Sequence, residues 1–193
     1  MYTWGYIKEN TLNKLNLTEG EANEHGFLKQ FPYYANEAIT QICSSIKPKE
    51  TYYEITIADW QVGSVNVMPS DFIAFSDSPI HWASTTDAPF IEISNEFLEF
   101  VGYASIRFKT AGTYRIPYDA RWQFFDSNTA DGVLLQMPAD ICDALPSYIA
   151  SQCYKLDDEL KAATYRNEYE MFLARMNDAS SRRQKDFFVG GGW

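Results

Sequence analysis

Apolar side chains recur at helical spacing near the start of the chain. One such stripe consists of Phe31, Ala35, Ile39, Ile42 and Ile46. Pro32 is compatible with the first turn of this helix, and Pro48 ends it. Upstream, Thr18 followed by Glu21 is a capping-box pattern that predicts another helix start. Residues 1–48 therefore predict helices whose apolar faces need a packing partner.

Residues 49–128 change to short, partly alternating apolar runs such as TYYEITIA, FIAF and PFIEIS, separated by Pro, Gly, Asp and Ser. β-branched and aromatic residues in runs of this length favour strands, and their close spacing favours a small antiparallel sandwich or barrel. The segment SIRFKTAGTYRIPY predicts a β-hairpin, with Ile106 and Phe108 on one face and residues 110–112 turning the chain.

Residues 129–178 return to helical spacing. Asp143 predicts one helix start, with Pro146 in its first turn, and Asp157 predicts a second. The second helix carries a narrow apolar stripe made of Tyr165, Tyr169, Phe172 and Met176. Because the link between these helices is short, they are expected to pack antiparallel.

The order of these sections predicts an α+β fold. The helices of 1–48 and the helical hairpin of 129–178 form one bundle, into which an antiparallel β-sandwich or barrel is inserted at 49–128. Residues 179–193 follow as an extended C-terminal arm. This arm combines basic with apolar side chains, namely Arg182, Arg183, Lys185, Phe187, Phe188 and Trp193. A disordered end is one interpretation of it, and an arm that buries its aromatic residues against a neighbouring molecule is the other.

The acids of YKLDDELKAATYRNEYE could be mistaken for a catalytic cluster. Helical spacing directs Asp157, Asp158 and Glu159 to different sides. Glu159 and Glu170 share a face but lie about 16 Å apart along the axis, whereas a pair of glycosidase carboxylates needs about 5 to 9.5 Å. We interpret the three acids as a helix start, where the N-terminal end of the helix dipole favours negative charge.

Composition narrows the classes of function. The 193 residues are 46% hydrophobic and 16% aromatic, enough for a sizeable core and for subunit contacts. The net charge of −10 disfavours tight nucleic-acid binding. Because the opening MYTWGYIKEN has no leader pattern and no apolar run has the length of a membrane span, we expect a soluble, unsecreted protein. The three cysteines are expected to be small buried residues.

No residue pattern predicts chemistry. The two histidines, His25 and His81, belong to no metal-ligand spacing. Ser78, His81 and Asp87, or Cys43 and His25, could be combined into catalytic sets, but no G-x-S-x-G, P-loop or dinucleotide-binding motif supports them. We therefore expect no enzyme activity, with no catalytic, cofactor or metal site.

Taken together, these segments resemble the head–tail connector (adaptor, or neck-ring) proteins of tailed bacteriophages. An N-terminal helical pair from LNKLNL to ANEAITQIC is followed by a β insertion that contains MPSDFIAF and closes with AGTYRIPYDARW. A helical hairpin, ALPSYIASQCYKLDDELKAATYRNEYEMFLARM, comes next and precedes the arm. The hairpin is the most specific part of the resemblance.

The resemblance implies a structural protein of the virion, made in the host bacterial cytoplasm and located in the neck. It implies a homo-oligomeric ring, with twelve subunits expected, that joins the portal protein to other neck or tail proteins. DNA passes through the ring's channel without specific binding, and no membrane is involved. The arm at 179–193 corresponds to the segment that docks on the portal or on a neighbouring subunit. The β insertion leaves open whether the chain forms the first ring below the portal or a later collar ring.

Two other functions remain as alternatives. A carbohydrate-binding module would use Trp60, Trp82 and Trp122 to stack on sugar rings. A carboxylate enzyme would bring acids from different segments, such as Glu37 and Glu168, into one cleft with raised pKa values.

Overall fold

A computed structural model describes residues 1–94 and 96–189, with the side chains of 179–189 excepted. The chain divides into two compact units, a helical unit of Met1–Lys47 with Trp122–Trp193 and a β unit of Pro48–Arg121. Helices and antiparallel sheets occur together, so the predicted α+β class is confirmed. The β unit begins at 48 and ends at 121, where the sequence pattern had indicated 49 and 128.

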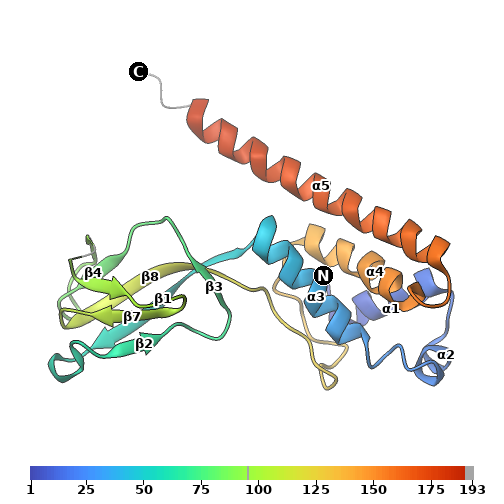
Figure 1. The fold of residues 1–193 in the computed structure, drawn as a ribbon, viewed down its shortest axis with the longest axis horizontal. Coiled ribbons are helices and arrows are strands. Elements are labelled where there is room, and N and C mark those ends of the chain that lie inside the picture. Colours follow the sequence, from blue (N-terminus) through green and yellow to red (C-terminus); the bar gives the residue numbers. More distant parts are fainter. Residues whose placement is uncertain (95, 190–193) are drawn as a thin grey trace. The chain divides into compact units, whose positions relative to one another are not determined.

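Five α-helices make up the described part of the helical unit (Figure 1). They are α1 (Trp4–Leu15), α2 (Glu19–Glu24), α3 (Phe31–Ser45), α4 (Ala139–Tyr154) and α5 (Glu159–Val189). In the helix starting after Thr18, the predicted capping box is present: the Thr18 hydroxyl accepts from the Glu21 N–H at 3.4 Å, and the Glu21 carboxylate accepts from the Thr18 N–H at 2.7 Å. Two free donors of the helix start are thereby satisfied.

Helix α3 buries the predicted stripe. Phe31, Ala35, Ile39 and Ile42 are fully buried, and Pro32 occupies the first turn. Ile46 lies one residue past the helix end and is half-buried. Full burial of side chains of this size contributes about 1.5–3 kcal/mol each for the Ile and Phe positions, so this face anchors the helical unit.

Helices α4 and α5 form the predicted antiparallel hairpin, joined by tyrosines. The rings of Tyr148 and Tyr169 meet edge to face with centroids 4.8 Å apart, and those of Tyr154 and Tyr165 stack at 6.0 Å. The later residue of α4 pairs with the earlier residue of α5, as expected for antiparallel helices. The Tyr165 hydroxyl donates to the backbone carbonyl oxygen of Lys14 at 2.6 Å, in the last turn of α1. This tyrosine seam therefore also satisfies a free carbonyl at the end of α1.

The starts of the two hairpin helices differ from the prediction. Helix α4 begins at Ala139, four residues before Asp143, so Pro146 lies inside the helix. Helix α5 begins at Glu159, and its cap is Asp158, whose carboxylate accepts from the Lys161 N–H at 3.0 Å. Asp157 does not cap the helix. It belongs to the tight turn before α5, in which the backbone N–H groups of Asp157 and Asp158 both donate to the Tyr154 carbonyl.

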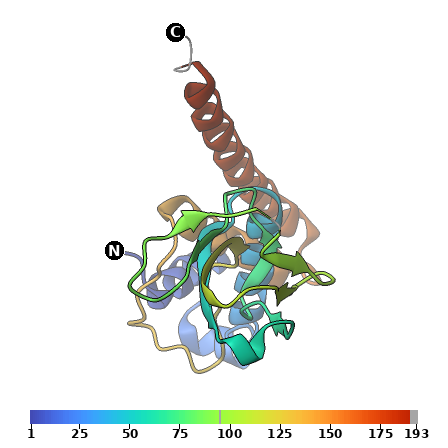
Figure 2. The same cartoon turned by 90° about the vertical axis from the view of Figure 1, so that its left-hand side faces the viewer.

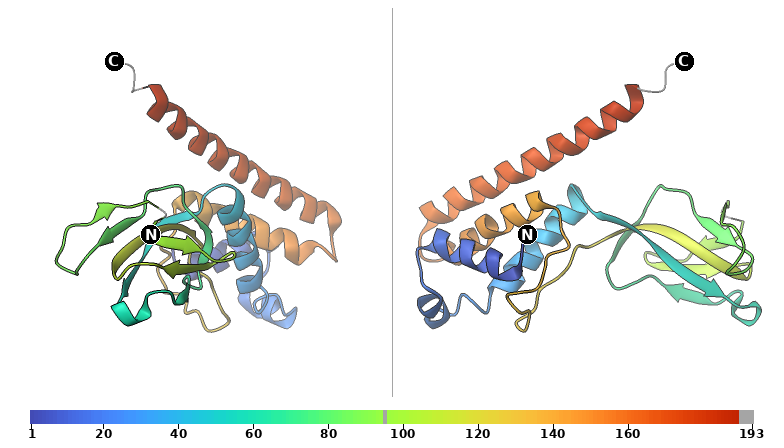
Figure 3. Two further views of the ribbon diagram at one scale, coloured as in Figure 1. Left: turned by 60° about the vertical axis from the view of Figure 1, so that its left-hand side comes forward. Right: turned by 180° about the vertical axis from the view of Figure 1, so that it is seen from behind.

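The predicted extended arm is wrong for residues 179–189, which continue helix α5 to Val189. The segment ASSRRQKD holds good helix formers and no Pro or Gly before Gly190, which explains the continuation. At 1.5 Å per residue, the 31 residues of α5 span roughly 46 Å and the 16 of α4 roughly 24 Å. The C-terminal half of α5 therefore projects past α4 (Figure 3). Residues 190–193 lie outside the described residues.

The β unit contains eight strands in its described part (Figure 2). These are β1 (Lys49–Ile57), β2 (Val65–Val67), β3 (Phe72–Phe75), β4 (His81–Ala83), β5 (Ile91–Glu92), β6 (Leu98–Phe100), β7 (Ser105–Phe108) and β8 (Gly112–Ala120). A larger sheet has the order β1-β8-β4-β5, with β3 also on β8, and a smaller sheet has the order β2-β7-β6. Strand β8 is central because it pairs with β1 along its full length and with β3 and β4 on its other edge.

The two sheets face each other across an apolar core. Ile106 and Phe108 of β7 are buried on one face, as predicted, and meet Tyr114 and Ile116 of β8, with the Phe108 and Tyr114 ring centroids 4.6 Å apart. The predicted hairpin between these strands is wrong, because β7 and β8 belong to different sheets. Both strands present an apolar face, and those faces are buried by packing against each other across the core.

Glycine is required where the chain crosses between the sheets. Gly112 has a φ of +137°, and a Cβ there would lie 2.2 Å from the Trp82 indole nitrogen and 2.6 Å from the Ala83 carbonyl oxygen. Neither the conformation nor the space admits a side chain. The crossover at 109–111 and the start of β8 thus depend on this residue.

The helical unit holds both ends of the insertion. The Trp122 indole N–H donates to the Lys47 carbonyl oxygen at 2.9 Å. Further on, the Asn36 amide donates to the Phe125 carbonyl at 2.7 Å and accepts from the Phe125 N–H at 2.9 Å. Phe125 also stacks on Trp4 at 4.2 Å between centroids. These contacts return the chain to the bundle immediately after the β unit.

The three cysteines are buried, as predicted. Burial raises the pKa of the Cys142 and Cys153 thiols to about 12, which keeps both protonated at neutral pH. Among the described residues, no helix is both long and apolar enough to cross a membrane.

Replacing Tyr169 by alanine is expected to lower the free energy of unfolding by about 3–5 kcal/mol, because a fully buried ring would be removed from the tyrosine seam. Tyr33, whose side chain is 72% exposed, serves as the matched control, and its alanine variant should change stability by less than about 0.5 kcal/mol. Urea unfolding followed by circular dichroism measures both. Equal effects of the two substitutions would contradict this account of the seam.

Alkaline pH is expected to destabilise both units. Burial raises the pKa of Tyr114, Tyr118 and Tyr148 to about 12, whereas these tyrosines ionise near 10 in the unfolded chain. The folded state then retains protons that the unfolded state loses, so the contribution of these tyrosines to stability is constant below about pH 10 and falls up to about pH 12, by at most about 1.4 kcal/mol per pH unit for each tyrosine. The buried thiols of Cys142 and Cys153 add to this fall and begin to do so at a lower pH, because thiols ionise near 8.5 in the unfolded chain. Unfolding free energies measured across this window test the slope. Tyr148→Phe should reduce the slope of the unfolding free energy against pH by the contribution of one tyrosine. An unfolding free energy that does not change across this pH range would contradict the account.

Candidate interaction surfaces

The residues predicted to form a binding arm fall on the last turns of α5. Arg182, Arg183, Lys185, Phe187 and Phe188 lie on this helix, but their side chains are outside the described residues, as is the whole of Trp193. Their role as a binding segment stays a prediction.

The acids that suggested chemistry have structural partners. Both carboxylate oxygens of Glu168 accept from the Lys14 ammonium at 2.8 Å, and Glu170 pairs with Arg166 at 2.6 Å. Burial, with a hydrogen bond to Glu37, raises the pKa of Tyr148 to about 12. Glu37 of α3 thus has Tyr148 of α4 as its partner, and Glu168 of α5 has Lys14 of α1. The enzyme alternative gains no support from them.

The residues that could have formed a nucleophilic set are dispersed. His25 stacks near Phe27 in the helical unit at 5.6 Å, and Cys43 is buried in α3. Ser78 and His81 line a pocket of the β unit, and Asp87 is not among the residues that line it. Among the side chains that the structure describes, those of 1–94 and 96–178, no three His, Cys, Asp or Glu gather as metal ligands would.

The three tryptophans of the carbohydrate alternative do not form one platform. The Trp82 indole donates to the Ala111 carbonyl at 3.1 Å and packs against Phe97 in the β core. Trp122 belongs to the helical unit. Trp60 is the exposed member of the set, with 84% of its surface accessible. Of the three, Trp60 alone is exposed, so they do not form the shared stacking surface that this alternative assumed.

Trp60 instead lies in a short 3₁₀ helix, Asp59–Gln61, and is the first of four exposed apolar residues that lead into the edge strand β2, a segment called the apolar edge below. This apolar edge comprises Trp60, Val62, Val65 and Val67, which are 84%, 40%, 47% and 70% exposed. Strand β2 inverts the usual pattern, because Val65 and Val67 face outward while Asn66 is half-buried. It is also the outer strand of its sheet, with one side of its backbone unpaired by β7. The sequence interpretation missed this surface because a three-residue run has too few positions to show which face is buried.

The helical hairpin also exposes large apolar side chains. Leu156 and Leu160, at the turn into α5, are 94% and 79% exposed, and Met171 is 56% exposed. Clusters of exposed apolar side chains on a folded protein mark surfaces for other molecules.

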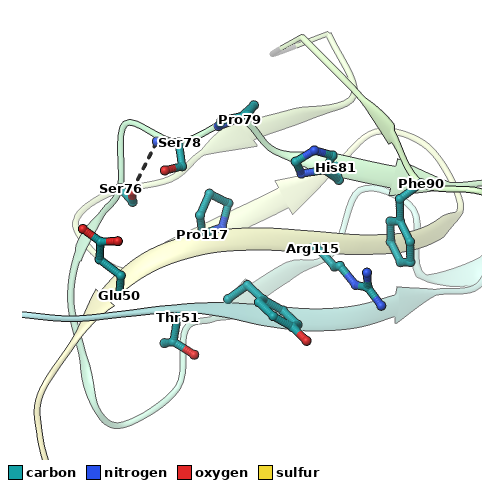
Figure 4. A pocket seen from close by; sticks show the side chains of 10 residues that line it. Glu50, Thr51, Ser76, Ser78, Pro79, His81, Phe90, Arg115 and Pro117 are labelled. Atoms are coloured by element: carbon teal, nitrogen blue, oxygen red, sulfur yellow. Dashed lines mark hydrogen bonds between the residues drawn. The ribbon is translucent and has the colours of Figure 1, made fainter. Parts of the chain in front are cut away.

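A pocket of about 450 Å³ lies on the larger sheet, on the face opposite the core (Figure 4). Tyr52, Pro79, Phe90 and Pro117 supply apolar walls. The Arg115 guanidinium lies 3.9 Å from the centre of the Phe90 ring. Its Nε–H donates to the Glu54 carboxylate at 2.7 Å, which neutralises this cation locally. The pocket is therefore an apolar hollow without an unpaired arginine.

No protein-family model matches the chain, and no curated protein matches it in sequence. Its structure is similar to that of a chain in the neck of an empty GTA particle computed with C6 symmetry, with 15% identity and a TM-score of 0.31 over 82% of this chain and 83% of that one. A similarity of this size does not establish a shared function.

Substituting Trp60 by lysine is expected to leave the free energy of unfolding within about 0.5 kcal/mol of wild type, because the side chain is exposed. Where copies of the chain associate through the apolar edge, the substitution should weaken that association about tenfold. Trp82→Ala is the contrasting variant and should destabilise the β unit by roughly 3 kcal/mol. Urea unfolding and analytical ultracentrifugation measure the two effects. Unchanged self-association in the folded lysine variant would exclude the apolar edge as a contact.

Proposed function

We propose that this chain is a structural protein of the neck of a tailed bacteriophage or phage-like particle. Copies of it form a ring that joins the portal to the tail and extends the DNA channel. The observation that carries the proposal is the apolar edge on β2, where Val65 and Val67 face outward from an edge strand. Monomeric proteins protect such edges, so a neighbouring molecule is the expected cover.

A ring needs two different surfaces on each copy, since a heterologous contact closes only when one face meets another. The chain offers candidates on separate elements, the apolar edge of β2 and the projecting part of α5. The number of copies proposed is twelve, following the resemblance in sequence. Portal and tail proteins, together with neighbouring copies, are the proposed partners.

Charge suits a channel through which DNA slides. The net charge of −10 repels phosphate and disfavours adhesion of DNA to the protein. Three acids of the helical hairpin have structural roles: Asp158 caps α5, and Glu168 and Glu170 form ion pairs. These features support a structural role rather than catalysis. The proposed location is the virion neck, after synthesis in the host bacterial cytoplasm.

The C-terminal segment is proposed to dock on the portal or on a neighbour. Deleting 180–193 should leave the helical unit folded, because the buried contacts of α5 already include Tyr169 and, further on, Met176, which is 3% exposed. The melting temperature is expected to change by less than about 4 °C. Binding to the portal protein, measured by co-sedimentation, should be lost.

Native mass measurement of the full chain, alone and with the portal protein, provides the companion test. A ring in the presence of the portal is expected. A monomer under both conditions, or normal attachment to virions by the truncated chain, would contradict the proposed function. A variant with only Asn167→Ala serves as a matched control on α5 outside the deleted segment, because that side chain is polar and exposed.

A further inference from the structure

The pocket of the larger sheet carries excess negative charge at one end. Glu50 of β1 lines it, and Asp119 of β8 lies directly opposite Glu50 in the strand register. Like charges in such a cross-strand pair repel each other. Burial, Glu50 and Asp77 together raise the pKa of the Asp119 carboxyl. In the part of the chain that the structure describes, neither Glu50 nor Asp119 forms an ion pair.

The size, apolar walls and carboxylates of the pocket indicate which kind of ligand it can bind. The pocket's 450 Å³ lies within the range of about 300–1,000 Å³ that is usual for binding pockets. Its walls of Tyr52, Phe90 and Pro117 suit an aromatic side chain, and the carboxylates at its end suit cations. Residues 48–121 as a whole hold ten Asp and Glu against five Lys and Arg. The matching ligand is a segment with clustered basic residues next to aromatic ones.

The chain itself contains such a segment. SSRRQKDFFV at 180–189 places Arg182, Arg183 and Lys185 just before Phe187 and Phe188, with Asp186 as its single acid. It is attached to helix α5, which extends past its partner α4. Charge and apolar character are therefore complementary between this segment and the pocket.

We propose that the pocket lined by Glu50, Tyr52 and Phe90 receives the C-terminal segment 180–189 of a second copy of this chain. One of the two phenylalanines packs on the apolar wall of the pocket beside the Arg115 guanidinium, which itself lies against the Tyr52 and Phe90 rings. The basic residues face Glu50 and Asp119. The inference rests on the proposed function, because the ring supplies the second copy. It adds to that function the surface that binds the segment. The contact between neighbouring copies is then heterologous, because a helix end of one copy meets a sheet face of the other.

Isotope-mixed photo-cross-linking tests this contact. Phe188 is replaced by a benzophenone amino acid in the full chain, and equal amounts of ¹⁴N and ¹⁵N protein are assembled and irradiated. Cross-links from position 188 to peptides containing Tyr52 or Phe90 are expected, with mixed isotopes. Because Glu50 and Tyr52 are exposed, Glu50→Lys and Tyr52→Ser should fold normally and should each reduce the mixed cross-links about tenfold. Glu96→Lys, the same charge reversal at an exposed position of the β unit outside the pocket lining, is the matched control and should leave them unchanged.

The outcomes separate this inference from the proposed function. If every cross-link to the pocket joins two peptides of the same isotope, the segment binds the pocket of its own chain. That result would overturn the proposal that a second copy supplies the segment. A ring by native mass without cross-links to the pocket would overturn this inference and leave the proposed function standing. A monomer by native mass, with no mixed cross-links, would overturn both. A decrease of the mixed cross-links at high salt is expected as well, since the contact is partly electrostatic.

Discussion

The tyrosine seam between α4 and α5 is the contact on which the helical unit depends. Tyr169 is fully buried against Tyr148, and the neighbouring Tyr165 uses its hydroxyl to bind the end of α1. Tyrosine combines a large apolar ring with one polar atom, so it can fill a core and satisfy a backbone group at its edge. A phenylalanine at 165 would supply the ring but leave the Lys14 carbonyl without this donor. The seam thus joins three helices that come from both ends of the chain.

The helical unit in turn makes a long insertion possible. Lys47 and Trp122 are joined by a hydrogen bond inside this unit, so the 74 residues of Pro48–Arg121 leave and return at one place. The β unit has its own core around β7 and β8, which means that it buries its apolar residues without help from the helices. Two separate cores allow each unit to expose surfaces that serve other molecules.

Those outward surfaces differ in character. The edge at Val65 and Val67 is apolar and offers backbone groups, whereas the pocket near Glu50 is apolar with carboxylates at one end. An edge strand favours a partner that adds main-chain hydrogen bonds, and an acidic hollow favours a basic, aromatic segment. In the proposed ring, contacts of unlike kind would give each surface one complementary face.

Local signals in the sequence determined most element types, although not the helical state of 179–189. They also determined the capping box at Thr18 and Glu21, the buried face of α3 and the antiparallel hairpin, since each follows from spacing within a few turns. Tertiary structure alone decided that β7 and β8 lie in different sheets, because alternation shows which face is buried and not which strand is adjacent. It also decided the position of the pocket. Glu50 and Asp119 are 69 residues apart in the chain, and only strand register places these two like charges side by side.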